Sequence, residues 1–332
     1  MIGGFLSLLS AVTFAYANAS VRRGVLTGTV VQAVTISLPV ALPFFLVTMA
    51  FGGGYAALAA FNTRSLALLA AAGVVHFALS RYCNYRATKA IGANLVAPIQ
   101  QYSLVLTLVL AVVWLGETLT PLRIIGIILV IAGPALTHER NKPTAIAADI
   151  PDGAGGFHKP FHPNYAEGYV FALLSALGFG ISPILIGMAF EHKGLAIGIA
   201  GGFVSYAAAT VAIVLPLLLP QEWRSFKSVD RLSAKWFLIS GITVCFSQMF
   251  RYMALAIAPV SVVSPIQRLS LVFRIYFGWM INPHHEVFGG RVMLGTVVSL
   301  LGAVALSVSA DGVAQFVHLP AAAAALLTWH WP

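Results

Sequence analysis

The stretch YRATKAIGANLVAPIQ at residues 85–100 returns as YMALAIAPVSVVSPIQ at residues 252–267. The copies share Tyr, Ala and Val at matching positions, and both end on Pro-Ile-Gln. A second echo links LLSAVTF at 8–14 to LLSALGF at 173–179. Self-similarity of this kind, half a chain apart, indicates that one structural unit is present twice.

The composition is that of a membrane protein. Of the 332 residues, 59% are hydrophobic and 9% are charged, whereas soluble domains carry about 25% charged residues. A bilayer crossing needs about 20 apolar residues, and such runs recur throughout the chain. We predict ten spans, at residues 3–20, 28–50, 66–88, 93–115, 121–138, 167–190, 195–219, 234–257, 261–281 and 290–310.

The net charge of +9 would suggest nucleic acid as the partner of a soluble protein. Here Lys and Arg concentrate in short loops beside the predicted spans, where they set topology and contact anionic lipid headgroups. We therefore expect a lipid bilayer and a small-molecule substrate as partners, no nucleic acid, and a monomer or homodimer. Both cysteines, Cys83 and Cys245, fall within predicted spans, so no disulfide framework is indicated.

The repeat divides the chain into two halves of five spans. We predict a first five-helix repeat at 1–138, a linker at 139–166, a second repeat at 167–310 and an apolar tail at 311–332. Because five is odd, the second half must enter the membrane from the opposite side. The predicted fold is an all-α membrane protein with ten transmembrane helices in two inverted five-helix repeats, a pattern typical of secondary transporters.

Local motifs add a family resemblance to this pattern. Both halves carry Y-x-A…P-I-Q, followed by GE at 116–117 or HE at 285–286, and a closing helix with two glycines seven residues apart. With FAYANASVRRG (14–24) and SRYCNYRATKAIGA (80–93), the chain resembles the EamA-type branch of the drug/metabolite transporter superfamily. The resemblance implies this fold, transport without enzymatic activity, and a plasma-membrane location such as a bacterial inner membrane. It specifies no substrate.

Four predicted helices carry polar side chains at helical spacing, which places them on one face of each helix. Such side chains inside a membrane face the bundle or a hydrated cavity, so we expect a central cavity; interhelical hydrogen bonds are the alternative. The four sets are Gln100, Ser103 and Thr107; Gln267, Ser270 and Arg274; His76, Ser80 and Asn84; and Thr243, Ser247 and Arg251.

The charges inside the predicted spans are positive. All ten acidic residues fall in predicted loops or at span ends, whereas Arg81, Arg251, Arg268 and Arg274 fall within spans. With no buried carboxylate expected to neutralise them, we predict a cationic cavity that binds anionic or zwitterionic substrates, since guanidinium groups suit carboxylate and phosphate. Arg81 and Arg251 could instead extend to the headgroups. Proton-coupled export of cationic drugs on a buried carboxylate is not expected.

The expected site has no cofactor, metal or catalytic residue, because neither HHE at 284–286 nor HKPFH at 158–162 has the spacing of a zinc hydrolase. His76 is either a proton relay or a structural side chain. Pro98 and Pro265 either expose carbonyls such as that of Asn94 or occupy a first helical turn. The expected substrate-binding residues are Arg274, Arg268, Gln267, Gln100, Gln101, Thr107, His76, Asn84, Arg81, Arg251, Tyr85 and Tyr252.

Other functions and features stay open at this point. A lipid or lipid-phosphate flippase would share the fold, and a non-transporting membrane scaffold is a further alternative. Loop charges favour an external N-terminus, whereas transporters that this chain resembles usually have both termini in the cytoplasm. The tail at 311–332 is expected to lie at the membrane interface rather than to form an eleventh span.

Overall fold

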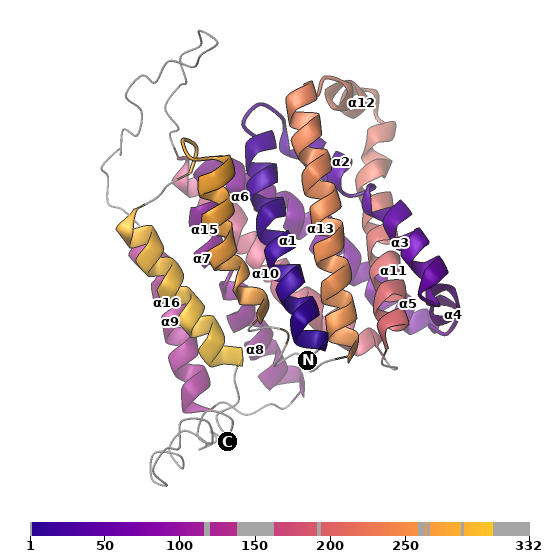
Figure 1. Ribbon diagram of the computed structural model, residues 1–332, viewed down its shortest axis with the longest axis horizontal. Coiled ribbons are helices and arrows are strands. Elements are labelled where there is room, and N and C mark those ends of the chain that lie inside the picture. Colours follow the sequence, from indigo (N-terminus) through magenta and orange to yellow (C-terminus); the bar gives the residue numbers. More distant parts are fainter. Residues whose placement is uncertain are drawn as a thin grey trace.

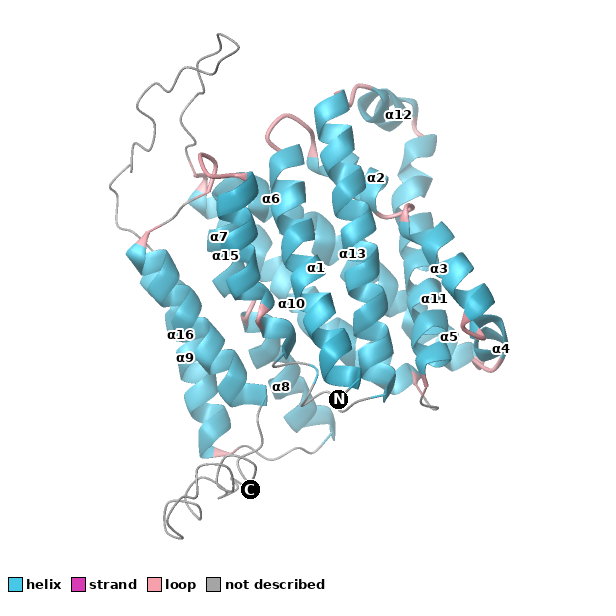
Figure 2. Cartoon of the chain, viewed as in Figure 1, coloured by secondary structure: helices cyan, strands magenta, loops and turns pink. Residues whose placement is uncertain are grey.

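The computed structural model describes residues 2–115, 120–137, 163–190, 194–257, 263, 266–286 and 289–307. Within these residues all regular structure is helical, as Figures 1 and 2 show. The first half contains α1 (Ile2–Gly24), α2 (Val30–Ser37), α3 (Ala41–Phe51), α4 (Gly54–Ala59), α5 (Thr63–Gly73), η1 (Val74–Ser80), α6 (Arg81–Ile91), α7 (Ala93–Ile99), α8 (Tyr102–Leu115) and α9 (Pro121–Thr137). The second contains α10 (Tyr165–Ala189), α11 (Leu195–Val214), η2 (Leu215–Leu218), α12 (Pro220–Lys227), α13 (Arg231–Ile257), α15 (Ser270–Ile281) and α16 (Gly290–Ser307).

The helices follow the ten predicted spans. Several spans consist of consecutive helices, such as α2 with α3 and α7 with α8. Length and apolar composition alone would let six helical stretches cross a bilayer: Ile2–Gly24, Val30–Phe51, Thr63–Ile91, Tyr165–Ala189, Leu195–Leu218 and Arg231–Ile257. The other predicted spans correspond to α7 with α8, α9, α15 and α16, which are shorter or interrupted.

The two halves pack against each other through equivalent pairs of helices, as a pseudo-two-fold relation requires. The first helix of one half, α1, packs along α13, the third membrane-crossing helix of the other half. Equivalently, α10 packs along α5, η1 and α6. The next contacts also correspond, because α8 packs on α10 and α15 packs on α1. Each half therefore buries its apolar faces against the other half.

The direction of the first helix in each half shows the inversion. Arg22, near the end of α1, donates a hydrogen bond from Nη1 to the Thr88 carbonyl at 3.0 Å, near the end of α6. Asn164, just before α10, donates its backbone N–H to the Ala90 carbonyl at 2.9 Å. The end of α1 and the beginning of α10 thus lie at the same end of the bundle. The two helices cross it in opposite directions, which confirms the predicted inverted repeat.

The closing helices of the halves, α9 and α16, lie side by side at one edge of the bundle (Figure 1). Glycines allow their backbones to approach. A Cβ on Gly302 would lie 2.7 Å from the Val130 nitrogen and 2.8 Å from the Gly126 carbonyl oxygen. Small residues at such interfaces permit the close packing that joins helices in lipid.

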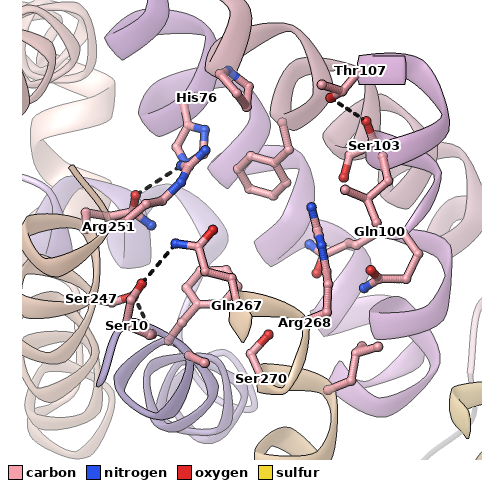
Figure 3. A pocket seen from close by; sticks show the side chains of 18 of the residues that line it. Ser10, His76, Gln100, Ser103, Thr107, Ser247, Arg251, Gln267, Arg268 and Ser270 are labelled. Atoms are coloured by element: carbon pink, nitrogen blue, oxygen red, sulfur yellow. Dashed lines mark hydrogen bonds between the residues drawn. The ribbon is translucent and has the colours of Figure 1, made fainter. Parts of the chain in front are cut away.

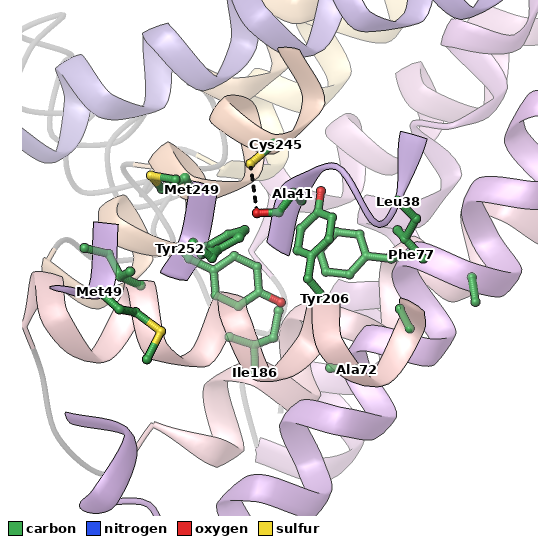
Figure 4. Close-up of a cluster of buried hydrophobic side chains, with 14 residues drawn as sticks. Leu38, Ala41, Met49, Ala72, Phe77, Ile186, Tyr206, Cys245, Met249 and Tyr252 are labelled. Atoms are coloured by element: carbon green, nitrogen blue, oxygen red, sulfur yellow. Dashed lines mark hydrogen bonds between the residues drawn. The ribbon is translucent and has the colours of Figure 1, made fainter. Parts of the chain in front are cut away.

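A buried core joins α3, α5, η1, α10, α11 and α13 (Figure 4). Its centre is aromatic, with the rings of Phe77 and Tyr206 stacked at a centroid distance of 4.1 Å. Tyr252 and Cys245, both fully buried, complete this core from α13. It fixes the third and eighth spans, which also face the site described next.

Three expectations fall wholly or mostly outside the described residues. The linker at 139–166 is described only from residue 163, and α10 begins at Tyr165 with the Asn164 side chain accepting from the Glu167 N–H. The tail at 311–332 and Pro265 lie outside the described residues altogether.

Candidate functional site

A polar cavity of about 120 Å³ lies between the two halves, at the level of η1 and of the break between α7 and α8. Because one water molecule needs about 10–15 Å³ on this measure, the cavity holds several. It brings together eight of the twelve expected binding residues: Arg274, Arg268, Gln267, Gln100, Gln101, Thr107, His76 and Arg251. Figure 3 labels six of them, from several helices around the cavity: His76, Gln100, Thr107, Arg251, Gln267 and Arg268.

Two broken helices present the glutamines and Arg268. Between α7 and α8, backbone hydrogen bonds to the third preceding residue replace those to the fourth. For example, the Gln101 N–H donates to the Pro98 carbonyl at 3.0 Å. In the second half, Leu269 N–H donates to the Ile266 carbonyl at 3.1 Å just before α15. The break in the first half lies directly after Pro98, which sits inside α7 beyond its first turn. Interrupted helices that point polar groups at a central site are common in transporter folds.

His76 occupies the π-helical segment η1, a distortion often found at functional sites. Its Nδ1 lies 2.6 Å from the Ser182 Oγ of α10. Its Nε2 lies 3.3 Å from Nη1 of Arg251, which reaches across from α13 (Figure 3). The ring thus connects three helices at one side of the cavity.

Arg274 is oriented by a chain of amides. It is 2% exposed, and its Nη1 donates to Gln100 Oε1 at 3.0 Å. Gln100 donates to Asn84 Oδ1 at 2.6 Å, and Asn84 donates to Asn18 Oδ1 at 3.3 Å. The Arg274 guanidinium also lies 5.6 Å from the centre of the Phe14 ring. Its Nε finds no hydrogen-bond partner among the described residues.

Two further guanidinium groups share the cavity. Arg268 extends between Gln267 and Gln100 in Figure 3, and its Nε has no hydrogen-bond partner among the described residues. Arg251 donates to Gln248 Oε1 at 3.3 Å as well as to the histidine. No Asp or Glu occurs among the described residues that line the cavity. The cavity therefore concentrates positive charge.

The other four expected residues lie outside this cavity. Arg81 does not extend to the headgroups: it is 4% exposed, donates to the Tyr206 hydroxyl at 2.9 Å and lies over the Phe77 ring. Arg81, Asn84 and Tyr85 line a neighbouring pocket of about 10 Å³. Tyr252 is buried in the aromatic core.

A buried carboxylate exists, contrary to the expectation from the sequence. Glu286 is 5% exposed and lies 3.6 Å from Nε of Arg22, measured to Oε1. It also accepts the backbone N–H groups of Ala93 and Asn94 at 2.9 and 3.0 Å, at the beginning of α7. Glu286 therefore caps a helix and compensates Arg22 at the end of α1; it does not line the cavity, but its charge also acts on Arg274.

Sequence reasoning missed three polar residues of the site. Gln248 lies three positions before Arg251, so helical spacing on α13 could have identified it. Ser10 lines the cavity from α1, and Ser182 binds His76 from α10. The polar faces of the first and sixth spans would have indicated both. Within the described residues no cluster of His, Cys, Asp and Glu could hold a metal ion.

Comparison with known proteins places the chain among membrane transporters. The model of the EamA-like transporter family matches residues 1–138 and 166–308. A solved structure described as "Crystal structure of protein" matches with a TM-score of 0.49 and 15% sequence identity, covering 96% of this chain and 98% of that one. The search of curated proteins found no match. One matched range lies in each half of the chain.

Proposed function

The chain belongs to the EamA-like transporter family, and we propose that it carries a small anionic or zwitterionic metabolite through the cavity between its halves. It is a multi-pass membrane transporter rather than an enzyme. We place it in a plasma membrane, such as the inner membrane of a bacterium. Two inverted halves have two near-equivalent packings, so exchange between them would open the cavity to each side in turn.

The charge balance of the cavity is the observation that supports this substrate class. Arg251, Arg268 and Arg274 line it, and no carboxylate occurs among its described lining residues. Guanidinium groups stay protonated in proteins, and an uncompensated buried charge is costly. A carboxylate or phosphate entering the cavity would supply the missing negative charge and accept hydrogen bonds from these groups.

Hydrogen bonding further supports a defined anion position. Gln100 holds Arg274 through Nη1, and Gln248 holds Arg251. Groups held before the substrate arrives lose little freedom on binding. Gln101 also lines the cavity, and its side-chain amide would suit the ammonium group of a zwitterion.

Thermal unfolding of the purified protein in detergent tests the proposal, because a ligand that binds only the folded state raises the melting temperature. The panel contains acetate, succinate, sulfate, alanine, the lipophilic cation tetraphenylphosphonium and the lipid phosphatidylglycerol. We expect stabilisation by acetate, succinate, sulfate or alanine. Arg274→Gln should weaken that binding about 10- to 100-fold, because it removes a charged hydrogen bond of about 1.5–3 kcal/mol.

Arg231→Gln is the matched control, since Arg231 is exposed at the beginning of α13. It should leave the stabilisation unchanged. Stabilisation by tetraphenylphosphonium alone would contradict the proposal. Stabilisation only by the lipid phosphatidylglycerol would favour a lipid carrier instead.

A further inference from the structure

We propose that His76 is a proton site coupled to the anion site, so that the protein binds one proton together with its anionic substrate. The inference rests on the proposed function, because it concerns the effect of a bound anion on a neighbouring side chain. It assigns the coupling ion of the transporter.

The hydrogen bonds of His76 define its present protonation state. Arg251 can only donate, because a guanidinium has no acceptor. The 3.3 Å contact therefore makes Nε2 of His76 the acceptor. In the neutral ring the hydrogen then lies on Nδ1, which donates to the Ser182 Oγ at 2.6 Å. These contacts fit the neutral Nδ1–H tautomer of His76.

The surroundings of His76 oppose a second proton while the cavity is empty. Arg251 faces it from α13, and Arg81 lines the same small pocket from α6. From α10 it meets Ser182 and the ring of Phe179, at a centroid distance of 4.6 Å. The charged groups among these described neighbours are both cations. Protonating Nε2 would add a third positive charge and replace the hydrogen bond from Arg251 by a donor–donor contact.

A bound anion would reverse this balance. Arg251 and His76 line the same cavity, so an anion beside Arg251 offsets the charge that His76 experiences. Turning Nη1 of Arg251 toward the anion also frees Nε2 of His76, which can then take a proton from the cavity water and donate to the anion. The proton leaves from the same nitrogen when the anion leaves. Each ligand thus favours the other, and this coupling is reciprocal.

Calorimetric titration of the full-length protein measures the coupling directly. Acetate, succinate, sulfate and alanine are titrated near pH 7.5 in two buffers with different ionisation enthalpies, since none of them takes up a proton there. The difference in heat gives the protons bound per anion. We expect an uptake approaching one proton, and an affinity that rises up to about tenfold for each unit by which the pH falls.

His76→Gln should bind the anion more weakly, because the contact from the protonated ring is lost, and the remaining binding should show neither proton uptake nor pH dependence. His284→Gln is the matched control, because His284 is exposed in the loop before α16, and it should behave like the unsubstituted protein. Anion binding without proton uptake between about pH 6 and 8, or proton uptake that persists in His76→Gln, would overturn the inference while leaving the anion site intact. If none of the four compounds binds, the proposed function fails together with it.

Discussion

Buried guanidinium groups among the described residues have three kinds of surroundings, and these differences support our proposal for the binding residues. Arg22 is compensated by Glu286 and by backbone carbonyls. Arg81 is held by a tyrosine hydroxyl and by aromatic rings. Arg274 has one amide partner and faces a cavity that can admit an anion. Among the described residues, the third kind faces a cavity that a ligand can enter, which is why we propose Arg274 and Arg268 as binding residues.

The pairing of Arg22 with Glu286 predicts a large stability effect. Arg22→Met would leave a buried carboxylate without its cation, and breaking a buried pair in this way costs about 3–5 kcal/mol. We expect a clear fall in the melting temperature in detergent. The neighbouring substitution Arg23→Met is the control, because Arg23 is partly exposed and should change little.

A second substitution distinguishes the charge effect from lost packing. Adding Glu286→Gln to Arg22→Met removes the uncompensated charge, so it should restore part of the lost stability. A double variant as unstable as the sum of the two single variants would contradict the pairing.

At the scale of helices, two features shape the molecule: interrupted helices position the polar side chains, and glycines let helices pack closely. The breaks beside Gln101 and Leu269 place polar side chains at the cavity from both halves. The sequence predicted a disturbance at Pro98, but the affected turn follows the proline because α7 continues to Ile99. Local hydrogen bonding, which the sequence does not reveal, determines that position.

Two glycine-to-alanine substitutions should affect stability differently. Gly302 lies in the contact between α9 and α16, whereas Gly187 lies in α10 with open space beside it. Gly302→Ala should destabilise the protein by about 1–3 kcal/mol, because its Cβ would press on backbone atoms of α9. Gly187→Ala in α10 meets open space and should be neutral or stabilise by up to about 1 kcal/mol. Thermal unfolding of both variants measures the difference. Equal effects would show that the helices do not pack as described.

At the scale of the whole molecule, the sequence predicted the architecture well because hydropathy and the internal repeat report directly on membrane crossings and inversion. The sequence predicted the surroundings of individual side chains less well. Tyr85 and Tyr252 occupy matching repeat positions, yet one lines a small pocket and the other lies in the aromatic core. Arg22 and Glu286 are far apart in the chain, so no local pattern could reveal their contact. The way in which the two diverged halves pack together determines both the surroundings of the two tyrosines and the contact between Arg22 and Glu286.

The central claim is that the arginine-lined cavity carries an anion or zwitterion across the membrane. Its most direct test is flux from proteoliposomes loaded with the radiolabelled panel compound that stabilises the protein best, compared between the unsubstituted protein and Arg268→Gln. We predict release well above that of protein-free vesicles, and at least about tenfold slower release with Arg268→Gln, because a charged hydrogen bond to the ligand is lost. Release no faster than from loaded vesicles without protein, or release unchanged by the substitution, would contradict the account.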